Sequence, residues 1–290
     1  MSILRKNCVI EMNNNFPPVT ISNSELRFLK SRLLGKEYRI LVALPTGYAE
    51  SKETYPVLYV LDADMYFGTI AETVRALAAF KKLLSIEAPD MIVVGVGYPI
   101  ESARCYTNWD MAKPSEYAGA RAKDLTSTEE ATMEGWPSGG ASDFMAFIRD
   151  DLKPLINSNY RANPEDSTIY GHSLGGLFGL YVLFHRPDTF NRYIVLSPSL
   201  WWGKKVTLDY ERIYANEHAG LPARLFLSVG SLERPIDLQN LQEFVQILQK
   251  RNYKGLEWAS YICEGENHLT ALQAATPRAI LSIFSSPKKD

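Results

Sequence analysis

Cysteine is scarce in this chain of 290 residues, which contains only Cys8, Cys105 and Cys263, an odd number of residues far apart. Their spacing excludes a cysteine-ligated metal site and a disulfide framework, and it favours reduced thiols. There is no excess of basic residues, since the net charge is −2, so nucleic acid is not an expected partner. No apolar run is long enough to cross a membrane, and we expect no membrane partner.

The chain also lacks a Pro-, Ser- or Gly-rich linker, an internal repeat and a low-complexity tract. We therefore expect one domain over residues 1–290, because 46% hydrophobic residues suffice for a large core. Residues 1–16 contain Arg5 and Lys6 but only Cys8-Val9-Ile10 as an apolar run, which does not make a secretory signal. This predicts a cytoplasmic protein, or a periplasmic one if a signal has been trimmed.

Strand-like and helical segments alternate along the chain. Strands are expected at 25–29, 37–44, 56–61, 91–96, 168–170, 193–196, 225–229 and 257–261, and helices at 69–84, 141–156, 174–184, 238–251 and 269–284. The first two strands alternate polar and apolar residues, which predicts an antiparallel pair at the sheet edge. The alternation predicts an α/β fold, with a mostly parallel central sheet and helices on both faces. Ligands bind such sheets at the carboxyl ends of the strands.

One connection is much longer than the others. Residues 98–140 contain three prolines (Pro99, Pro114 and Pro137), many charges and no clear hydrophobic period. A loop of this length in a compact domain is usually a lid, a binding loop or disordered. We expect a substrate-facing insertion, and the alternative is a solvated excursion.

The sequence Gly171-His172-Ser173-Leu174-Gly175 follows a short β-prone run and precedes an apolar helical one. This is the G-x-S-x-G pattern of a nucleophile elbow, in which a tight strand-to-helix turn pushes the serine outward above the sheet. The glycines remove side chains that would clash at so sharp a corner. The alternative is a glycine-rich turn in a buried strand–helix unit.

A serine hydroxyl needs a base, and the chain contains only four histidines. His172 lies inside the elbow, and its side chain should leave the turn in a different direction from Ser173. His185 and His218 lie at predicted helix ends. His268 lies in a turn-rich loop between the last predicted strand and the last helix, so it is the expected base, and a solvated loop histidine is the alternative.

The third member of such a triad orients the imidazole, and in α/β-hydrolases the order along the chain is serine, acid, histidine. Glu233 meets this order, because it follows Ser173, precedes His268 and lies just beyond the strand at 225–229. Asp237 is the alternative acid. The other interpretation of Glu233 is a surface ion pair with Arg234.

The oxyanion of an ester-hydrolysis intermediate needs two backbone N–H donors. We expect these to be Leu174 and Asp64, with Ala63 as the second choice for the latter. The Asp64 carboxylate must then point away from the developing charge. Chemistry of this kind requires no metal and no organic cofactor.

Several stretches together resemble the esterase-D-like branch of the α/β-hydrolases, nearest to the siderophore esterases that open trilactones such as enterobactin and bacillibactin. They are Leu44 to Tyr48, Tyr55 to Asp62, Val94 to Pro99, Gly171 to Gly176, Leu196 to Trp202, Val229 to Glu233, and Asn267-His268. The resemblance implies an α/β-hydrolase fold, a serine esterase, and a triad of Ser173, His268 and Glu233.

Two positions depart from the family pattern. The family commonly has glycine where Ala63 stands, and it has an arginine before Asp-Leu-Thr-Pro after the Gly-Tyr-Pro strand. We assign that place to Arg104, which is followed here by a different sequence, and expect it to contact an anionic substrate or to lie on the surface.

Trp201 and Trp202 follow the strand after the elbow helix, so we expect them near the mouth of the site as substrate-binding residues; the alternative is a core position. Tyr106, Trp109 and Tyr117, in the long connection, could cover the same mouth. The sequence thus predicts a serine ester hydrolase for a small-molecule ester, as a monomer or weak homo-oligomer. The alternatives are an acyl or carbohydrate esterase, a thioesterase, or a binding module that kept the fold without turnover.

Overall fold

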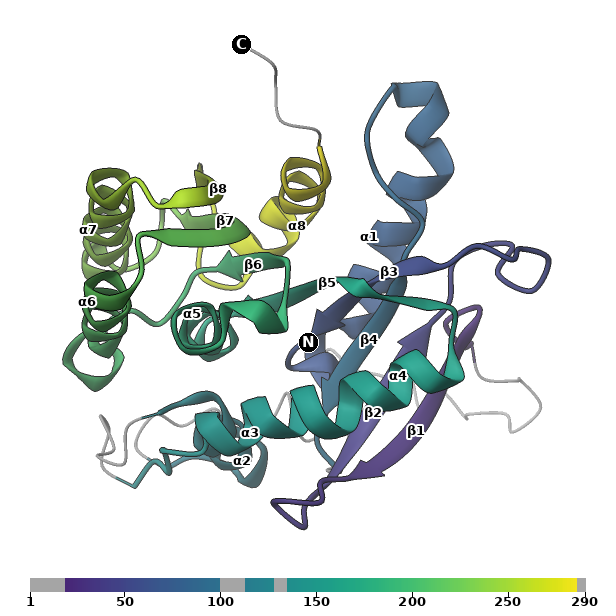
Figure 1. Cartoon of the computed structure of the whole chain (residues 1–290), viewed down its shortest axis with the longest axis horizontal. Helices are drawn as coiled ribbons and strands as arrows, with labels where there is room; N and C mark the ends of the chain where they lie inside the picture. The colour runs from purple at the N-terminus through teal and green to yellow at the C-terminus, as the bar shows by residue number, and fades with distance from the viewer. Residues whose placement is uncertain (1–18, 100–112, 128–134, 286–290) are drawn as a thin grey trace, which may run out of the picture.

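An eight-stranded β-sheet runs through the middle of the molecule (Figure 1). The computed structural model describes residues 19–99, 113–127 and 135–285. The strands are β1 (Ser24–Lys30), β2 (Glu37–Ala43), β3 (Tyr55–Val60), β4 (Ile92–Gly97), β5 (Ala162–His172), β6 (Arg192–Leu196), β7 (Gly220–Gly230) and β8 (Lys254–Cys263). Each corresponds to a predicted strand, although β5, β7 and β8 extend further than their apolar centres indicated.

The strand order is β1-β2-β4-β3-β5-β6-β7-β8. Strand β2 pairs antiparallel with both β1 and β4, and the other neighbouring strands pair in parallel. The predicted antiparallel edge pair and the mostly parallel sheet are therefore confirmed. Because β3 to β8 all run in the same direction, their carboxyl ends lie along one side of the sheet, where such folds bind ligands.

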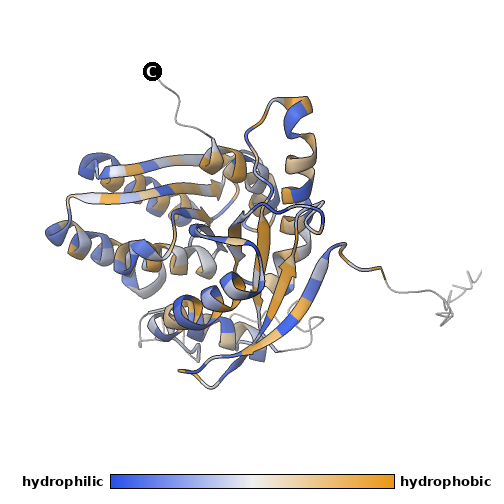
Figure 2. Cartoon of the chain, turned by 45° about the vertical axis from the view of Figure 1, so that its right-hand side comes forward, coloured by the Kyte–Doolittle hydropathy of each residue, from blue (hydrophilic) through white to orange (hydrophobic). Residues whose placement is uncertain are grey.

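Helices cover both faces of the sheet. They are α1 (Ala63–Leu84), α2 (Glu116–Leu125), α3 (Ala141–Phe147), α4 (Lys153–Asn159), α5 (Leu174–His185), α6 (Val206–Glu217), α7 (Pro235–Arg251) and α8 (Thr270–Phe284), and a π-helical turn (Ile148–Leu152) joins α3 to α4. The buried side chains of α1 and α8 form one apolar layer, and those of the other helices form a second layer on the opposite face. Figure 2 shows the apolar central strands between helices whose outer faces are hydrophilic.

Two helices, α2 and α6, lie where no apolar period predicted a helix. Both turn charged residues inward. In α6 the buried Glu211 accepts hydrogen bonds from Arg251 at 2.8 Å and from the Tyr253 hydroxyl at 2.7 Å. In α2 the buried Asp124 accepts one from the Tyr38 hydroxyl at 2.8 Å. Paired charges on the inner face hide the apolar stripe by which an amphipathic helix is recognised.

The segment 98–140, expected as a substrate-facing insertion or a solvated excursion, contains helix α2. Helix α2 buries Tyr117, Ala122 and Leu125 in the core, each 1% exposed or less. The Tyr117 ring packs edge-on against Tyr98, with ring centroids 5.6 Å apart, so Tyr117 does not cover the mouth of a site. Residues 100–112, which include Arg104, Tyr106 and Trp109, lie outside the described residues.

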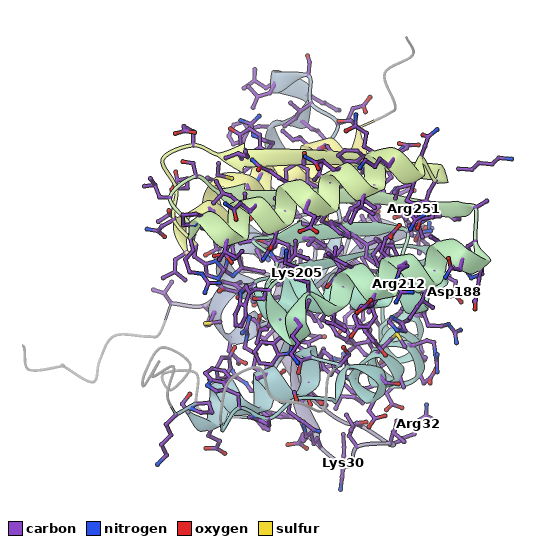
Figure 3. All side chains as sticks on the ribbon, turned by 90° about the vertical axis from the view of Figure 1, so that its left-hand side faces the viewer. Lys30, Arg32, Asp188, Lys205, Arg212 and Arg251 are labelled. Atoms are coloured by element: carbon purple, nitrogen blue, oxygen red, sulfur yellow. The ribbon has the colours of Figure 1, made fainter. Side chains whose placement is uncertain are left out.

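Charged side chains of both signs cover the outer helices (Figure 3). Lys205 pairs with Glu243 at 2.8 Å, and Arg212 pairs with Asp209 at 3.0 Å. Exposed pairs of this kind contribute at most about 1 kcal/mol each, so the apolar layers dominate the stability of the fold. None of the helices in the described ranges has the length and apolar character needed to span a membrane.

Candidate active site

Ser173 occupies the sharp turn between β5 and α5. Its backbone has φ 58° and ψ −118°, a conformation that costs a residue with a side chain about 1–3 kcal/mol. A Cβ on Gly171 would lie 2.1 Å from the carbonyl oxygen of Gly175, so only glycine fits this corner. The sharp strand-to-helix turn expected from the G-x-S-x-G pattern is therefore present, with Ser173 at the carboxyl end of a central strand.

His268 and Glu233 form a direct pair. The Nδ1 atom of His268 lies 2.6 Å from Glu233 Oε2, and the carboxylate is 2% exposed whereas the imidazole is 45% exposed. The other oxygen, Oε1, accepts hydrogen bonds from the Ser197 hydroxyl at 2.6 Å and from the Gly230 N–H at 2.8 Å. Burial alone would raise the pKa of Glu233, but the bonds from His268, Ser197 and Gly230 outweigh it and hold the pKa below its usual value. The carboxylate is thus ionised at neutral pH.

Asp237, the alternative acid, has a different partner. Its two oxygens accept hydrogen bonds from Arg234, each at 2.7 Å. The Arg234 guanidinium in turn lies over the Trp201 ring, 5.2 Å from its centroid. Arg234 therefore pairs with Asp237 rather than with Glu233, and the structure brings Glu233, not Asp237, to the histidine.

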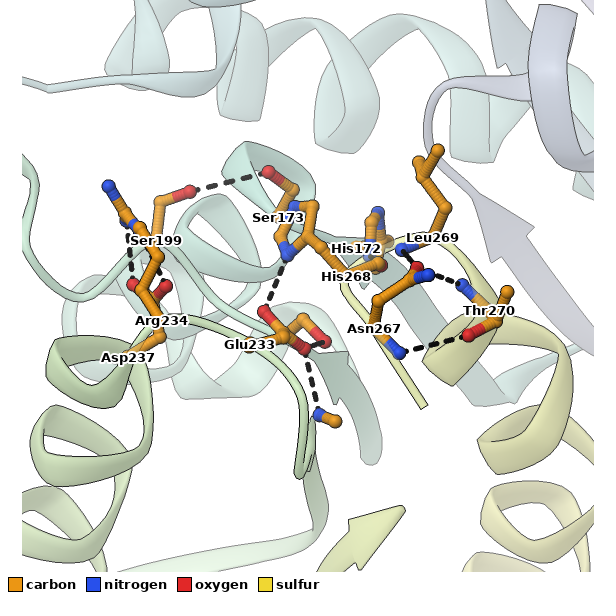
Figure 4. A network of polar contacts seen from close by, with 12 residues as sticks. His172, Ser173, Ser199, Glu233, Arg234, Asp237, Asn267, His268, Leu269 and Thr270 are labelled. Carbon is orange, nitrogen blue, oxygen red and sulfur yellow. Dashed lines mark hydrogen bonds and ion pairs between the residues drawn. The ribbon is translucent and has the colours of Figure 1, made fainter. Parts of the chain in front are cut away.

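Ser173, Glu233 and His268 follow the carboxyl ends of β5, β7 and β8, respectively, and lie near one another (Figure 4). The Ser173 hydroxyl lies 3.4 Å from that of Ser199, within hydrogen-bond range. In the described parts of the chain, no hydrogen bond joins the Ser173 hydroxyl to the His268 ring, and such bonds are often long in an apo enzyme and shorten in the reacting complex. A serine, an imidazole and an ionised carboxylate in this order are equipped to activate a hydroxyl nucleophile.

The predicted oxyanion donors lie at two helix N-termini. Leu174 is the first residue of α5, and Ala63 and Asp64 are the first two of α1. The Asp64 carboxylate accepts hydrogen bonds from Arg39 Nη1 at 2.8 Å and from the Tyr98 N–H at 2.7 Å. The carboxylate is therefore bonded to Arg39 and Tyr98, and a backbone N–H donor at Asp64 requires that this carboxylate point away from the oxyanion. The assignment of Leu174 and Asp64 as donors stays a prediction.

The two tryptophans differ in exposure. Trp202 is 1% exposed and belongs to the core, whereas Trp201 is half-buried and packs against the edge of that core. Trp202 is therefore not placed to touch a ligand, and a substrate contact would fall to Trp201. The indole rings themselves lie 5.6 Å apart.

Sequence reasoning missed a buried ion pair beneath the elbow. Arg121 of α2 donates to both oxygens of Asp62, at 2.6 and 2.8 Å, and to the carbonyl oxygen of His172 at 3.3 Å. The side chains are 5% and 0% exposed. The signal was available, because the Asp-Leu-Thr that the family resemblance places after an arginine stands at Asp124-Leu125-Thr126, just after Arg121. Arg121 therefore fits the family's arginine position as well as Arg104 does, and Arg104 lies outside the described residues.

The sheet order, the strained elbow serine and the adjoining histidine–glutamate pair define an α/β-hydrolase. Comparison with known proteins agrees, because the sequence model of the family described as "Putative esterase" matches residues 31–271. The chain is 32% identical to the ferri-bacillibactin esterase BesA of Bacillus subtilis over 276 residues, covering 90% of this chain and 89% of the relative. It is 31% identical to the siderophore triacetylfusarinine C esterase of Aspergillus fumigatus over 232 residues, covering 77% and 73%.

A solved structure gives the same result. The BES protein from Bacillus cereus is 33% identical and superposes with a TM-score of 0.80, covering 94% of this chain and 99% of that one. The chain therefore belongs to the "Putative esterase" family, and it is an esterase with the α/β-hydrolase fold. This confirms the resemblance drawn from the sequence.

Proposed function

We propose that this esterase is a serine carboxylic-ester hydrolase in which Ser173 is the nucleophile, His268 the base and Glu233 the acid of the triad. The observation that carries the proposal is the 2.6 Å contact between His268 Nδ1 and the buried Glu233 carboxylate, next to the elbow serine. An ionised carboxylate at Nδ1 keeps the proton on that nitrogen, which leaves Nε2 free of a proton and able to act as a base.

The reaction follows from these roles. Ser173 Oγ attacks the ester carbonyl carbon while His268 Nε2 takes the hydroxyl proton, and the oxyanion is held by the N–H groups of Leu174 and Asp64. The intermediate collapses, His268 gives its proton to the departing alkoxide, and the alcohol leaves. Water, activated by His268, then attacks the acyl-enzyme and releases the carboxylic acid and Ser173.

For the substrate we propose a siderophore with several ester bonds, of the trilactone type. The support is the identity to relatives named for ferri-bacillibactin and triacetylfusarinine C, over nine-tenths and three-quarters of this chain. The half-buried Trp201 adds a flat apolar surface at the same end of the sheet, beside the ion pair of Arg234 and Asp237. An apolar ring surface of this kind suits a ligand that carries aromatic rings, such as a catecholate.

The test is hydrolysis by the purified chain of a catecholate trilactone and a hydroxamate triester, each with and without iron, beside p-nitrophenyl acetate. We expect mass spectrometry to detect ring-opened products of at least one siderophore, formed faster than the acetate is cleaved and not formed by Ser173→Ala. Cleavage of the simple ester alone would contradict the siderophore assignment and favour an acyl esterase or thioesterase. No cleavage of any ester would contradict the triad and favour a binding module.

A further inference from the structure

His172, the residue before the elbow serine, has no role in the triad, yet it is among the most enclosed polar residues of the fold. It is 2% exposed and closes β5 at its carboxyl end. Its Nε2 atom lies 2.7 Å from the main-chain oxygen of His268, and its Nδ1 atom lies 3.2 Å from the hydroxyl of Tyr66 on α1. The ring thus joins two segments that are far apart in the sequence.

These two contacts define the tautomer of His172. A carbonyl oxygen accepts hydrogen bonds and cannot donate, so Nε2 must carry a proton and donate to His268. In the neutral ring Nδ1 is then an acceptor, and the Tyr66 hydroxyl donates to it. One neutral tautomer therefore satisfies both contacts.

The bond to His172 complements the bond to Glu233. Glu233 holds the side chain of His268 at Nδ1. Among the described residues, His172 supplies the one hydrogen bond that the main-chain oxygen of His268 accepts. With one anchor at the ring and one at the backbone, rotation and sliding of the imidazole relative to Ser173 are both restricted.

We propose that His172 is a positioning residue, which holds the backbone of His268 where Nε2 of His268 can reach the Ser173 hydroxyl. Tyr66 selects the tautomer of His172 that makes this bond. The proposal rests on the triad proposed above. His172 touches neither the substrate nor the reacting atoms, so its effect is transmitted through His268.

The charged groups around His172 favour its neutral form. The ring centroids of His172 and His268 are 4.6 Å apart, and Arg121 donates a hydrogen bond to the carbonyl oxygen of His172. Burial, then the proximity of His268 and Arg121, lowers the pKa of His172 to about 3. A neutral His172 places no positive charge beside His268 at the moment when His268 itself becomes an imidazolium, which would otherwise be disfavoured.

The test compares His172→Phe with His172→Gln. Phenylalanine fills the space but cannot donate, whereas the glutamine amide nitrogen lies close to the position of Nε2 and can. The matched control is His185→Phe, because His185 also donates to a carbonyl oxygen, that of Tyr181 at 2.8 Å, but lies at the far end of α5. The readouts are kcat, KM, and the rate and stoichiometry of labelling by a fluorophosphonate probe.

We expect His172→Phe to lower kcat and the labelling rate constant by about tenfold, the upper range for loss of one hydrogen bond, with KM and a stoichiometry of one label per chain unchanged. His172→Gln should recover most of the rate, and His185→Phe should match the wild type. A labelling rate equal to that of the wild type in His172→Phe, or no recovery with glutamine, would overturn the proposal.

Tyr66→Phe provides a test that leaves His172 in place, in case His172→Phe does not fold. It should slow labelling by about threefold, the lower range for one hydrogen bond, and have little further effect in the His172→Gln background. Equal slowing in both backgrounds, or none, would contradict the tautomer argument. Failure of the triad itself has a different signature, which is a wild-type chain not labelled at Ser173.

Discussion

Replacing Glu233 with glutamine should reverse the tautomer of His268, and the surroundings of the carboxylate show why. Oε1 faces the Gly230 N–H at 2.8 Å, and a backbone N–H can only donate. The amide oxygen of a glutamine must therefore take that side, which turns its NH₂ group toward His268 Nδ1. Nδ1 then has to accept, so the ring proton moves to Nε2, the atom that must remove a proton from Ser173.

We expect Glu233→Gln to reduce kcat by about 10² to 10⁴, or about 2.7 to 5.4 kcal/mol of transition-state stabilisation, with little change in KM. The control is Asp237→Asn, which breaks only the pair with Arg234 and should change kcat by less than about threefold, because that pair is exposed on the arginine side. The assay is p-nitrophenyl ester hydrolysis, normalised to the folded fraction. A larger loss in Asp237→Asn than in Glu233→Gln would refute the argument.

Four further predictions concern stability and specificity. The pKa of His172 is about 3 in the folded chain and near 6.5 in the unfolded chain, so the unfolded chain binds the proton first as the pH falls. The free energy of unfolding should therefore decrease by up to ~1.4 kcal/mol per pH unit as the pH falls from about 6.5 toward 3. Urea titrations at pH 7 and pH 5 should show a smaller decrease in His172→Gln than in the wild type. Ser173→Gly should be more stable in urea than Ser173→Ala, by about 1–2 kcal/mol, since glycine tolerates φ 58°; equal stabilities would contradict strain at the elbow. Trp201→Ala should reduce the kcat/KM preference for aryl over acetyl esters by about 1–3 kcal/mol. Trp202→Ala should instead lower the free energy of unfolding by about 3–5 kcal/mol. The reverse pattern would contradict the half-buried position of Trp201 and the core position of Trp202. Arg121→Met should lower the free energy of unfolding by about 3–5 kcal/mol, because it leaves the Asp62 carboxylate buried and unpaired; a loss under 1 kcal/mol would show that the pair is not needed.

Local patterns in the sequence were sufficient to predict the parts of the fold that depend on apolar burial. The continuous apolar runs of β3 and β4 and the apolar α5 were sufficient to predict these elements. The order serine, acid, histidine singled out Glu233 and His268, whose side chains the structure places in contact. The strand–turn–helix context predicted the sharp turn at which Ser173 lies. These features are recognisable because each depends on a short stretch of chain.

Features built from long-range pairing of polar groups were missed. Helix α2 has Arg121 and Asp124 on its buried face, and their partners, Asp62 and Tyr38, lie 59 and 86 positions away. The contact from His172 to His268 spans 96 positions and involves a main-chain oxygen. Every residue has such an oxygen, so the residue types do not indicate this contact. Such groups form hydrogen bonds with one another only after the sheet has formed. A local sequence pattern therefore does not show which residue pairs with which.

Covalent labelling of the purified chain with a fluorophosphonate, followed by peptide mapping, tests directly whether Ser173 is the nucleophile. We expect a single modified residue, Ser173, and no labelling of Ser173→Ala. Labelling of Glu233→Gln should be slower by at least about a hundredfold, because His268 loses the correct tautomer. Modification of a different serine, or labelling of Ser173→Ala at the wild-type rate, would contradict the assignment of Ser173 as the nucleophile.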